Sequence, residues 1–323
     1  MSLESILSSQ QPQHHETKHN EYLEEYSNDS KASTESEGNE HNSDMELNSL
    51  ESSSAVTKQT ETEFIKAFHK YYVDPSCNSN GNFDNYLTNA LNLINSLPKS
   101  FPNKTQIHSI AQKLQLPKEN LNNVLKKTII LDLDETLIHS DLDNVYADQH
   151  DALLYFDTDD DGVEEKDVAI PLIIRPGMYE FLEYLSSNFE VFVFTASCKS
   201  YADAILNYIE KDKKYFDVRL YREHCLFLEP GLYIKDLSIL AQHRQMESVI
   251  IIDNSIFSFA NQLDNGILIT SFYNDKSDSL LSNVQMYLDS VITKSLDIRK
   301  NNRDNFMFDL YRKNLLKNKL SIC

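Results

Sequence analysis

The stretch TIILDLDETL, residues 128–137, joins an apolar run to two closely spaced acids. Its first four residues predict a short buried strand. Asp132 follows at the end of that strand, and Asp134 stands two residues later. A carboxylate at a strand tip can act as a nucleophile when a metal or backbone amides shield its charge, and a second carboxylate in the loop can protonate a leaving group. The stretch therefore predicts the start of a sheet and a candidate catalytic pair.

Further along the chain, strand-like and helix-like patterns alternate. Apolar runs at 189–194, 248–252 and 266–269 each predict another buried strand. Helical patterns at 178–185, 201–210, 237–242 and 279–291 follow or separate them. Alternation of this kind predicts an α/β fold, a Rossmann-like parallel sheet with helices on both faces.

Two pairs of β-like segments depart from this alternation. Residues 152–156 and 168–174, separated by an acidic turn, predict a β-hairpin inserted soon after the first strand. Residues 218–221 and 225–228 predict a second hairpin.

Polar residues stand where the later strands end or the next helices begin. They are the Thr195-Ala196-Ser197 segment, Lys235 and the Asp253-Asn254-Ser255 segment. Hydroxyl and amide groups suit phosphate oxygens, and side-chain oxygens suit Mg²⁺. Each segment alone has an ordinary structural explanation as a helix cap, a solvated lysine or a turn. Because the carboxyl ends of parallel strands share one edge, the ordered set predicts a phosphate pocket with Mg²⁺, in which Thr136 ties down the first loop.

The composition changes sharply outside this region. Residues 1–60 are rich in Ser, Glu, Asn and Gln, which predicts a disordered acidic tail. Helical spacing at 64–72, 86–97, 107–114 and 117–126 predicts a small helical module over 61–126. We expect the catalytic domain at 127–295 and a C-terminal helical tail at 296–323, and both helical extensions are candidates for docking partners.

The overall charge and the cysteines limit the function classes. The net charge is −20, and the first 63 residues hold fourteen acids against three lysines, which argues against direct nucleic-acid binding. The four cysteines fit neither a zinc site nor a disulfide framework, and we find no transmembrane or signal segment, so we expect an intracellular protein of nucleus or cytoplasm. The four cysteines are Cys77, Cys198, Cys225 and Cys323.

The motifs DLDETL, TAS, YIKDLS and DNS, in this order and spacing, resemble the haloacid dehalogenase superfamily. They are most similar to its small C-terminal-domain phosphatase-like branch, the NLI-interacting-factor-like phosphatases. The resemblance covers about 127–295 and implies a haloacid dehalogenase-like fold and a phosphoprotein phosphatase that needs Mg²⁺.

The resemblance also implies roles for the matching residues. It implies that Asp132 is the nucleophile and a metal ligand, and that Asp134 is the acid/base with a metal-binding backbone carbonyl. Asn254 resembles the third protein ligand, and the resemblance implies that Asp253 lies close by and reaches the metal through water. Thr195 and Lys235 resemble the phosphate clamp. Arg222 matches an arginine near the substrate phosphate, although a surface salt bridge explains it as well.

In the resembling family, the insertion borders the substrate pocket. The resemblance therefore implies that apolar side chains of the insertion contact residues beside a phosphoserine. For any single one of these side chains, ordinary packing within the hairpin is the simpler explanation. The segments at Ile256, 229–233 and 271–273 depart from the family pattern, which leaves the substrate preference open. Two alternatives remain open: a non-catalytic phosphoprotein-binding or import-receptor-like scaffold, and a small-molecule phosphatase. The candidates for contacts are Leu142, Tyr155, Phe156 and Ile170.

Overall fold

The computed structural model describes residues 82–98, 101–114, 116, 126–143, 145–146, 148–156, 168–228 and 231–320. The expected acidic tail, the helix expected at 64–72 and most of the one expected at 117–126 lie outside these residues.

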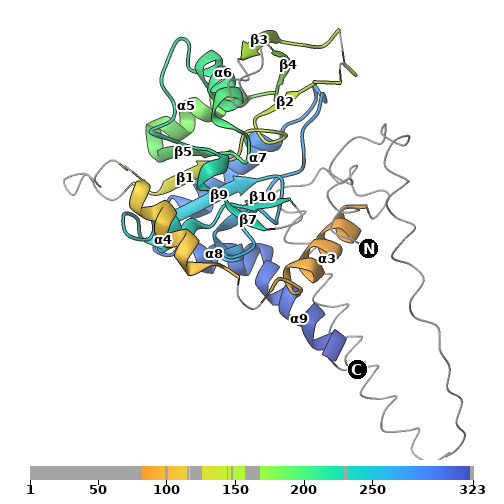
Figure 1. The fold of residues 1–323 in the computed structure, drawn as a ribbon, viewed down its shortest axis with the longest axis vertical. Helices are drawn as coiled ribbons and strands as arrows, with labels where there is room; N and C mark the ends of the chain where they lie inside the picture. The colour runs from red at the N-terminus through yellow and green to blue at the C-terminus, as the bar shows by residue number, and fades with distance from the viewer. Residues whose placement is uncertain are drawn as a thin grey trace, which may run out of the picture. The chain divides into compact units, whose positions relative to one another are not determined.

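Five parallel strands form the central sheet, in the order β10-β9-β1-β5-β6 (Figure 1). Thr128 of β1 lies opposite Glu190 of β5 on one side and Val249 of β9 on the other. All residues of β1 and β9 are buried, as the apolar runs 129–131 and 249–252 predict for a sheet covered on both faces. This confirms the α/β fold. The strands are β1 (Thr128–Leu131), β5 (Glu190–Phe194), β6 (Val218–Leu220), β9 (Val249–Asp253) and β10 (Gly266–Leu268).

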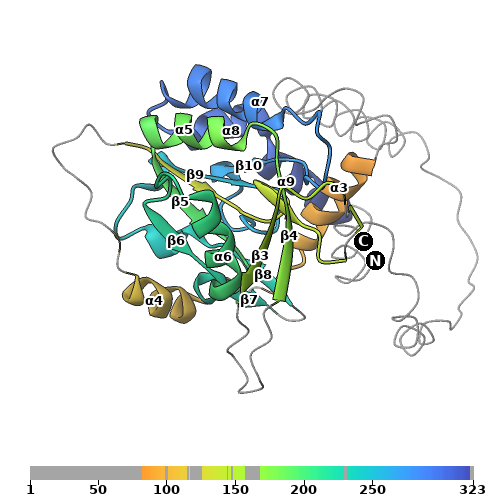
Figure 2. The ribbon, with the colours of Figure 1, turned by 90° about the horizontal axis from the view of Figure 1, so that it is seen from above.

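Helices cover both faces of this sheet. Figure 2 shows α5 (Met178–Asn188) beside α7 (Leu280–Tyr287) on one face and α6 (Lys199–Ile209) on the other. The predicted helix at 279–291 ends in a π-helical turn, η7 (Leu288–Ile292). Helix α5 buries side chains at helical spacing, and each large one contributes about 1.5–3 kcal/mol by leaving water. They are Met178, Phe181, Leu182 and Leu185.

The order of the strands creates a switch point next to β1. The chain passes from β1 to β5 and β6 on one side, then crosses to β9 and β10 on the other side. Ligands of open parallel sheets bind at the carboxyl ends of the strands where the order reverses. Asp132 follows β1 and Asp253 ends β9, so both acids lie at this point.

The inserted segment forms a second, antiparallel sheet in the order β2-β4-β3. The predicted hairpin of β3 (Ala152–Phe156) and β4 (Val168–Ile174) is confirmed, and β2 (Ile138–Ser140) adds a third strand. The second predicted hairpin is wrong. Strand β6 joins the central sheet, and β7 (Leu226–Leu228) pairs with β8 (Leu232–Ile234). An alternating pattern identifies a strand but not its partner, and η3 (Arg222–His224) turns the chain away from β6.

Short 3₁₀ turns connect the remaining strands. The helix expected at 237–242 is one such turn, η4 (Leu237–Leu240), which Asp236 caps by accepting a hydrogen bond from the Ser238 amide. The others are η5 (Met246–Ser248) and η6 (Leu263–Asn265).

Helices from the two extensions contact each other. Helix α3 (Asn82–Ile94) packs on α9 (Phe308–Leu320), and the hydroxyls of Thr88 and Tyr311 lie 2.9 Å apart. The Asn95 side-chain amide also donates to the Arg312 carbonyl, at 2.9 Å. The remaining helices are α4 (Lys104–Lys113) and α8 (Ile298–Phe306). Among the described residues, we find no helix with the length and apolarity that crossing a membrane requires.

Candidate active site

Strand β1 delivers Asp132 to the carboxyl edge of the sheet. The Asp132 amide donates to the Ile252 carbonyl at 3.0 Å, which extends the pairing of β1 with β9 by one residue. The side chain is nearly buried, and its Oδ1 atom accepts from the Lys235 ammonium at 2.5 Å. Two segments separated by 103 residues therefore meet at one carboxylate.

Lys235 lies between two acids rather than in solvent. It follows β8, and its Nζ atom also donates to Asp253 Oδ2 at 2.7 Å. Burial alone lowers the pKa of Lys235, but attraction to Asp132 and Asp253 outweighs it and raises that pKa. Burial and repulsion from Asp132 raise the pKa of Asp253 to about 6, and Lys235 opposes this rise. The ammonium thus remains charged and holds the Asp132 and Asp253 carboxyl groups close to each other.

Thr136 brings the first and last motifs together. Its hydroxyl lies 3.1 Å from Asp132 Oδ2 and 3.3 Å from the side-chain oxygen Oδ1 of Asn254. The same hydroxyl oxygen accepts a hydrogen bond from the backbone N–H of Asn254 at 3.2 Å. Asn254 Nδ2 donates to Ser271 Oγ at 3.0 Å, which fixes the orientation of the amide group. Oxygens of Asp132 and Asn254 therefore both lie next to the Thr136 hydroxyl.

These oxygens suit a hard cation. Mg²⁺ binds a few carboxylate and carbonyl oxygens and keeps several waters, so it does not need a cage of acids. In the described part of the chain, no group of three or more His, Cys, Asp and Glu side chains is placed to hold a metal. Two buried acids, Asp132 and Asp253, with the Asn254 amide oxygen fit Mg²⁺ better than they fit zinc, which prefers nitrogen and sulfur.

Asp134 lies in a different environment from Asp132. Ser197 Oγ donates to its Oδ2 atom at 2.8 Å, and Thr195 Oγ1 lies 3.4 Å from the same oxygen. Burial of the carboxyl raises the pKa of Asp134 to about 6, and the negative charge of Glu135 adds to the rise. Hydrogen bonds from Tyr201 and Ser197 oppose it. A carboxyl with this pKa exchanges protons near neutral pH, as a general acid and base must.

The segment after β5 lies beside Asp134. Thr195 is buried, and its hydroxyl accepts from the Ser197 amide at 2.9 Å. The Ala196 carbonyl accepts from Arg222 Nε at 2.7 Å, and the Arg222 guanidinium lies over the Tyr233 ring, 5.2 Å from its centroid. Arg222 is exposed, and its hydrogen bond goes to the Ala196 carbonyl rather than to an acid.

The contact residues proposed on the insertion divide into two groups. Leu142 and Tyr155 are each 58% exposed. Ile170 is fully buried, so the expectation that it contacts a substrate is not supported, because it belongs to the core beneath the inserted sheet. The side chain of Phe156 lies outside the described residues.

Sequence reasoning missed two residues that contact the site. Tyr201 donates from its hydroxyl to Asp134 Oδ1 at 2.5 Å, and Ser271 holds the Asn254 amide. Tyr201 stands in the first turn of the helix that follows the Thr195–Ser197 segment. Its position in the sequence therefore indicated that it lies near the candidate site. The direction of its side chain was not readable from the sequence.

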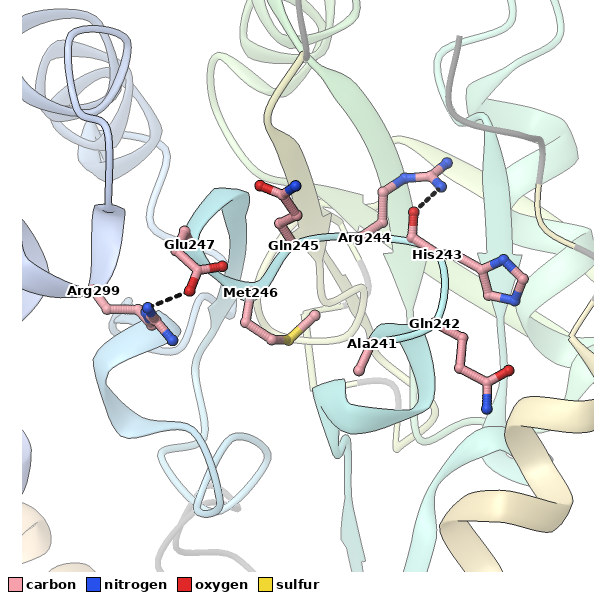
Figure 3. Close-up of a pocket in the computed structure, with 8 residues that line it drawn as sticks. All are labelled: Ala241, Gln242, His243, Arg244, Gln245, Met246, Glu247 and Arg299. Atoms are coloured by element: carbon pink, nitrogen blue, oxygen red, sulfur yellow. Dashed lines mark hydrogen bonds and ion pairs between the residues drawn. The ribbon is translucent and has the colours of Figure 1, made fainter. Parts of the chain in front are cut away.

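A hollow lies at the amino edge of the sheet, opposite the candidate site. It is lined by residues 241–247 and Arg299, as Figure 3 shows. Arg244 forms two hydrogen bonds with Glu190, and Arg299 pairs with Glu247 at 2.6 Å. Its arginines are thus engaged by acids, and none of the predicted site residues lies there.

The sequence is similar to known proteins over about half of its length. The sequence profile of the NLI interacting factor-like phosphatases matches residues 127–299. CTD nuclear envelope phosphatase 1B of Danio rerio is 36% identical over 194 residues, covering 58% of this chain and 76% of that protein. CTD small phosphatase-like protein 2 of Dictyostelium discoideum is 38% identical over 190 residues, covering 59% of this chain.

The length shared with the relatives varies. The chain spans 31% of the Dictyostelium protein and 43% of phosphatase PSR1 of Saccharomyces cerevisiae, to which it is 37% identical over 196 residues. A solved structure of Fcp1, titled an essential RNA polymerase II CTD phosphatase, is 20% identical with a TM-score of 0.39, covering 61% of this chain and 53% of that chain. The resemblance inferred from the motifs is confirmed. Because the matched profile covers more than half of the sequence, the chain belongs to the NLI interacting factor-like phosphatase family.

Proposed function

We propose that this chain is a Mg²⁺-dependent protein serine/threonine phosphatase that forms an aspartyl-phosphate on Asp132. The observation that carries the proposal is the Lys235 ammonium held between Asp132 and Asp253, with Thr136 joining Asp132 to Asn254. The family of the chain and the names of its relatives support a phosphatase.

In the first step, a carboxylate oxygen of Asp132 attacks the phosphorus of a phosphoserine or phosphothreonine. The bond from phosphorus to the serine or threonine oxygen breaks, and Asp134 gives its proton to that oxygen. Asp134 is suited to this task because its raised pKa keeps a substantial protonated fraction at mildly acidic pH.

In the second step, Asp134 accepts a proton from a water molecule that attacks the phosphorus. The bond from phosphorus to Asp132 breaks, and inorganic phosphate and the free carboxylate are regenerated. The same residue thus serves first as an acid and then as a base.

Positive charge is needed because an anionic carboxylate approaches an anionic ester. Lys235 supplies one charge, and we assign Arg222, Thr195, Ala196 and Ser197 to the phosphate oxygens. Bound Mg²⁺ would offset further charge on the phosphoryl oxygens. Its ligands would be Asp132, the Asp134 backbone carbonyl and Asn254, with Asp253 close by.

We propose a protein substrate because the inserted sheet presents apolar side chains beside the site. Leu153 and Tyr155 lie on one face of β3 and are 52% and 58% exposed. Ser140, on strand β2 of the same inserted sheet, contacts Tyr201, which reaches Asp134. Exposed apolar surface of this kind fits the side chains of a phosphorylated protein segment better than a sugar phosphate.

We further propose that the protein acts inside the cell, in the nucleus or cytoplasm. Cys198 and Cys225 are both free thiols, as expected in a reducing compartment. The helical extensions remain candidates for docking partners.

Turnover by the purified full chain tests the proposal. We expect phosphate release from phosphoserine and phosphothreonine peptides with Mg²⁺, and its loss when EDTA removes the metal. Sugar phosphates should react much more slowly. Binding of phosphopeptides without turnover would instead support a scaffold, and faster turnover of sugar phosphates would support a small-molecule phosphatase.

A further inference from the structure

Tyr201 makes the shortest hydrogen bond to Asp134 that the structure shows. Its hydroxyl donates to Oδ1 at 2.5 Å, whereas Ser197 and Thr195 contact Oδ2. The Ser140 hydroxyl contacts the Tyr201 hydroxyl in turn. Since the single phenol proton goes to Asp134, Ser140 donates to the Tyr201 oxygen. Each oxygen of the Asp134 carboxyl is therefore held by different partners.

Three segments of the chain converge on this carboxyl. Asp134 lies in the loop after β1, Ser140 ends β2 of the inserted sheet, and Tyr201 stands in the first turn of α6. Helix α6 also contacts β3 of the inserted sheet. The ring of Tyr201 thus links the insertion to the carboxyl that faces the reaction.

A carboxyl acting as a proton donor must present one chosen oxygen to the leaving group. Rotation about its terminal bond interchanges the two oxygens, and that torsion has a broad energy profile. A hydrogen bond fixed to Oδ1 by a packed tyrosine restricts this rotation, which leaves Oδ2, on the side of the Thr195–Ser197 segment, for proton transfer. Such orientation accelerates a reaction by placing the reacting atoms in advance.

We propose that Tyr201 is a positioning residue that orients Asp134 toward the leaving-group oxygen. The inference rests on the proposed role of Asp134 as general acid and adds a residue to it. In this role the tyrosine hydroxyl, and not the ring, affects the rate of the step in which the ester bond breaks.

This role predicts a dependence on the leaving group. Poor leaving groups, such as alkyl alcohols and serine, need protonation as they depart, whereas acidic nitrophenols need little. Tyr201→Phe removes the hydroxyl and keeps the ring. We expect kcat for alkyl and phosphoserine substrates to fall by about 10–100-fold, and kcat for nitrophenyl phosphates to change by less than about threefold, with KM nearly unchanged.

Tyr221→Phe is the matched control. The Tyr221 hydroxyl donates to Asp203 at 2.6 Å, so the same substitution removes a buried tyrosine hydroxyl bonded to a different acid. We expect this variant to keep the wild-type rate on all the phosphate esters. The Asp134→Asn variant provides the second reference, because Tyr201→Phe should cause no further loss in that background.

The result that overturns the inference is a Tyr201→Phe variant with wild-type rates, with an equal loss on every ester, or with a change confined to KM. An additional loss in the Asp134→Asn background would overturn it as well. If Tyr201→Phe does not fold, Ser140→Ala decides, since it removes the partner that supports the tyrosine hydroxyl. It should show the same leaving-group trend with a smaller loss, and a flat profile would contradict the role.

Failure of the proposed function gives a different pattern. Wild-type protein that hydrolyses no phosphate ester with Mg²⁺ would remove the phosphatase proposal itself. Active wild-type protein with an Asp134→Asn variant that shows no leaving-group dependence would remove the role of Asp134. An active enzyme that depends on Asp134 and is indifferent to Tyr201 would contradict this inference alone.

Discussion

Both edges of the central sheet hold buried or half-buried charged groups, but the ratio of acidic to basic side chains differs between the two edges. At the amino edge, Arg244 forms two hydrogen bonds with Glu190, and Thr128 donates to the same carboxylate at 2.7 Å. At the carboxyl edge, Asp132 and Asp253 share the single ammonium of Lys235.

This difference separates a structural cluster from a candidate catalytic one. Paired charges at the amino edge are satisfied and fix the ends of β1 and β5. At the carboxyl edge, among the described residues, two buried acids outnumber the buried cation in contact with them, and Asp134 lies close by with a pKa of about 6. An edge with excess negative charge attracts a cation, which is what the proposed Mg²⁺-dependent reaction requires.

The largest expected effect comes from removing the charge at the tip of β1. Asp132→Asn should lower kcat on the order of 10³-fold or more, because the proposed nucleophile is lost. Initial rates on a nitrophenyl phosphate measure the effect. Glu190→Gln at the other edge is the control and should keep kcat. Comparable losses of kcat in both variants would contradict the interpretation that only the carboxyl edge is catalytic.

The next effect is on stability. Lys235→Met leaves two buried carboxylates without their cation and should lower the free energy of unfolding by about 3–5 kcal/mol. Arg244→Met leaves only Glu190, which is partly exposed, and should cost less, about 1–3 kcal/mol.

Denaturant unfolding with and without Mg²⁺ sharpens this prediction. Mg²⁺ should restore part of the stability lost in Lys235→Met, because it supplies positive charge at the same acids. It should leave Arg244→Met unchanged. An equal response of both variants to Mg²⁺ would argue against a cation site at the carboxyl edge.

A smaller effect follows from pH. In the proposed mechanism Asp134 carries a proton when the ester bond breaks, and burial raises its pKa to about 6. The value of kcat/KM for a phosphoserine peptide should therefore fall above about pH 6, approaching tenfold per pH unit. Steady-state rates between about pH 5 and 8 check this limb. A rate that stays level or rises across this range would contradict the role of Asp134 as acid.

The smallest effect is expected at the rim of the amino-edge hollow (Figure 3). Arg299 and Glu247 form a partly exposed ion pair, which contributes about 0–1 kcal/mol. Arg299→Gln should leave kcat unchanged and shift the unfolding midpoint only slightly, as thermal melts and initial rates would show. A large loss of activity would mean that this edge also takes part in function.

The core of the fold and the site was predictable from the sequence. Strands β1 and β9 hold the apolar runs 129–131 and 249–252, and an acid comes directly after each run, so their place in a parallel sheet was predictable. Lys235 and Thr195 were found because each stands at a strand or helix boundary.

Other features depend on contacts that a local pattern does not encode. Strand β2 is only three residues long, and β7 pairs with β8 through tertiary packing that alternation leaves open. Tyr201 begins the helical pattern at 201–210, but its reach to Asp134 depends on where α6 lies against the loop. That Asp132 and Asp253 share Lys235 could likewise be seen only in the folded structure.

The most direct test of the account is to trap the phosphorylated enzyme. The wild-type protein is mixed with substrate and Mg²⁺, quenched in acid within one turnover, and digested for mass spectrometry. We predict an acid-stable, base-labile phosphate on Asp132, in the peptide containing residues 128–138, and none in Asp132→Asn. Rapid turnover with no phosphate on Asp132, or with Asp132→Asn still active, would contradict the account.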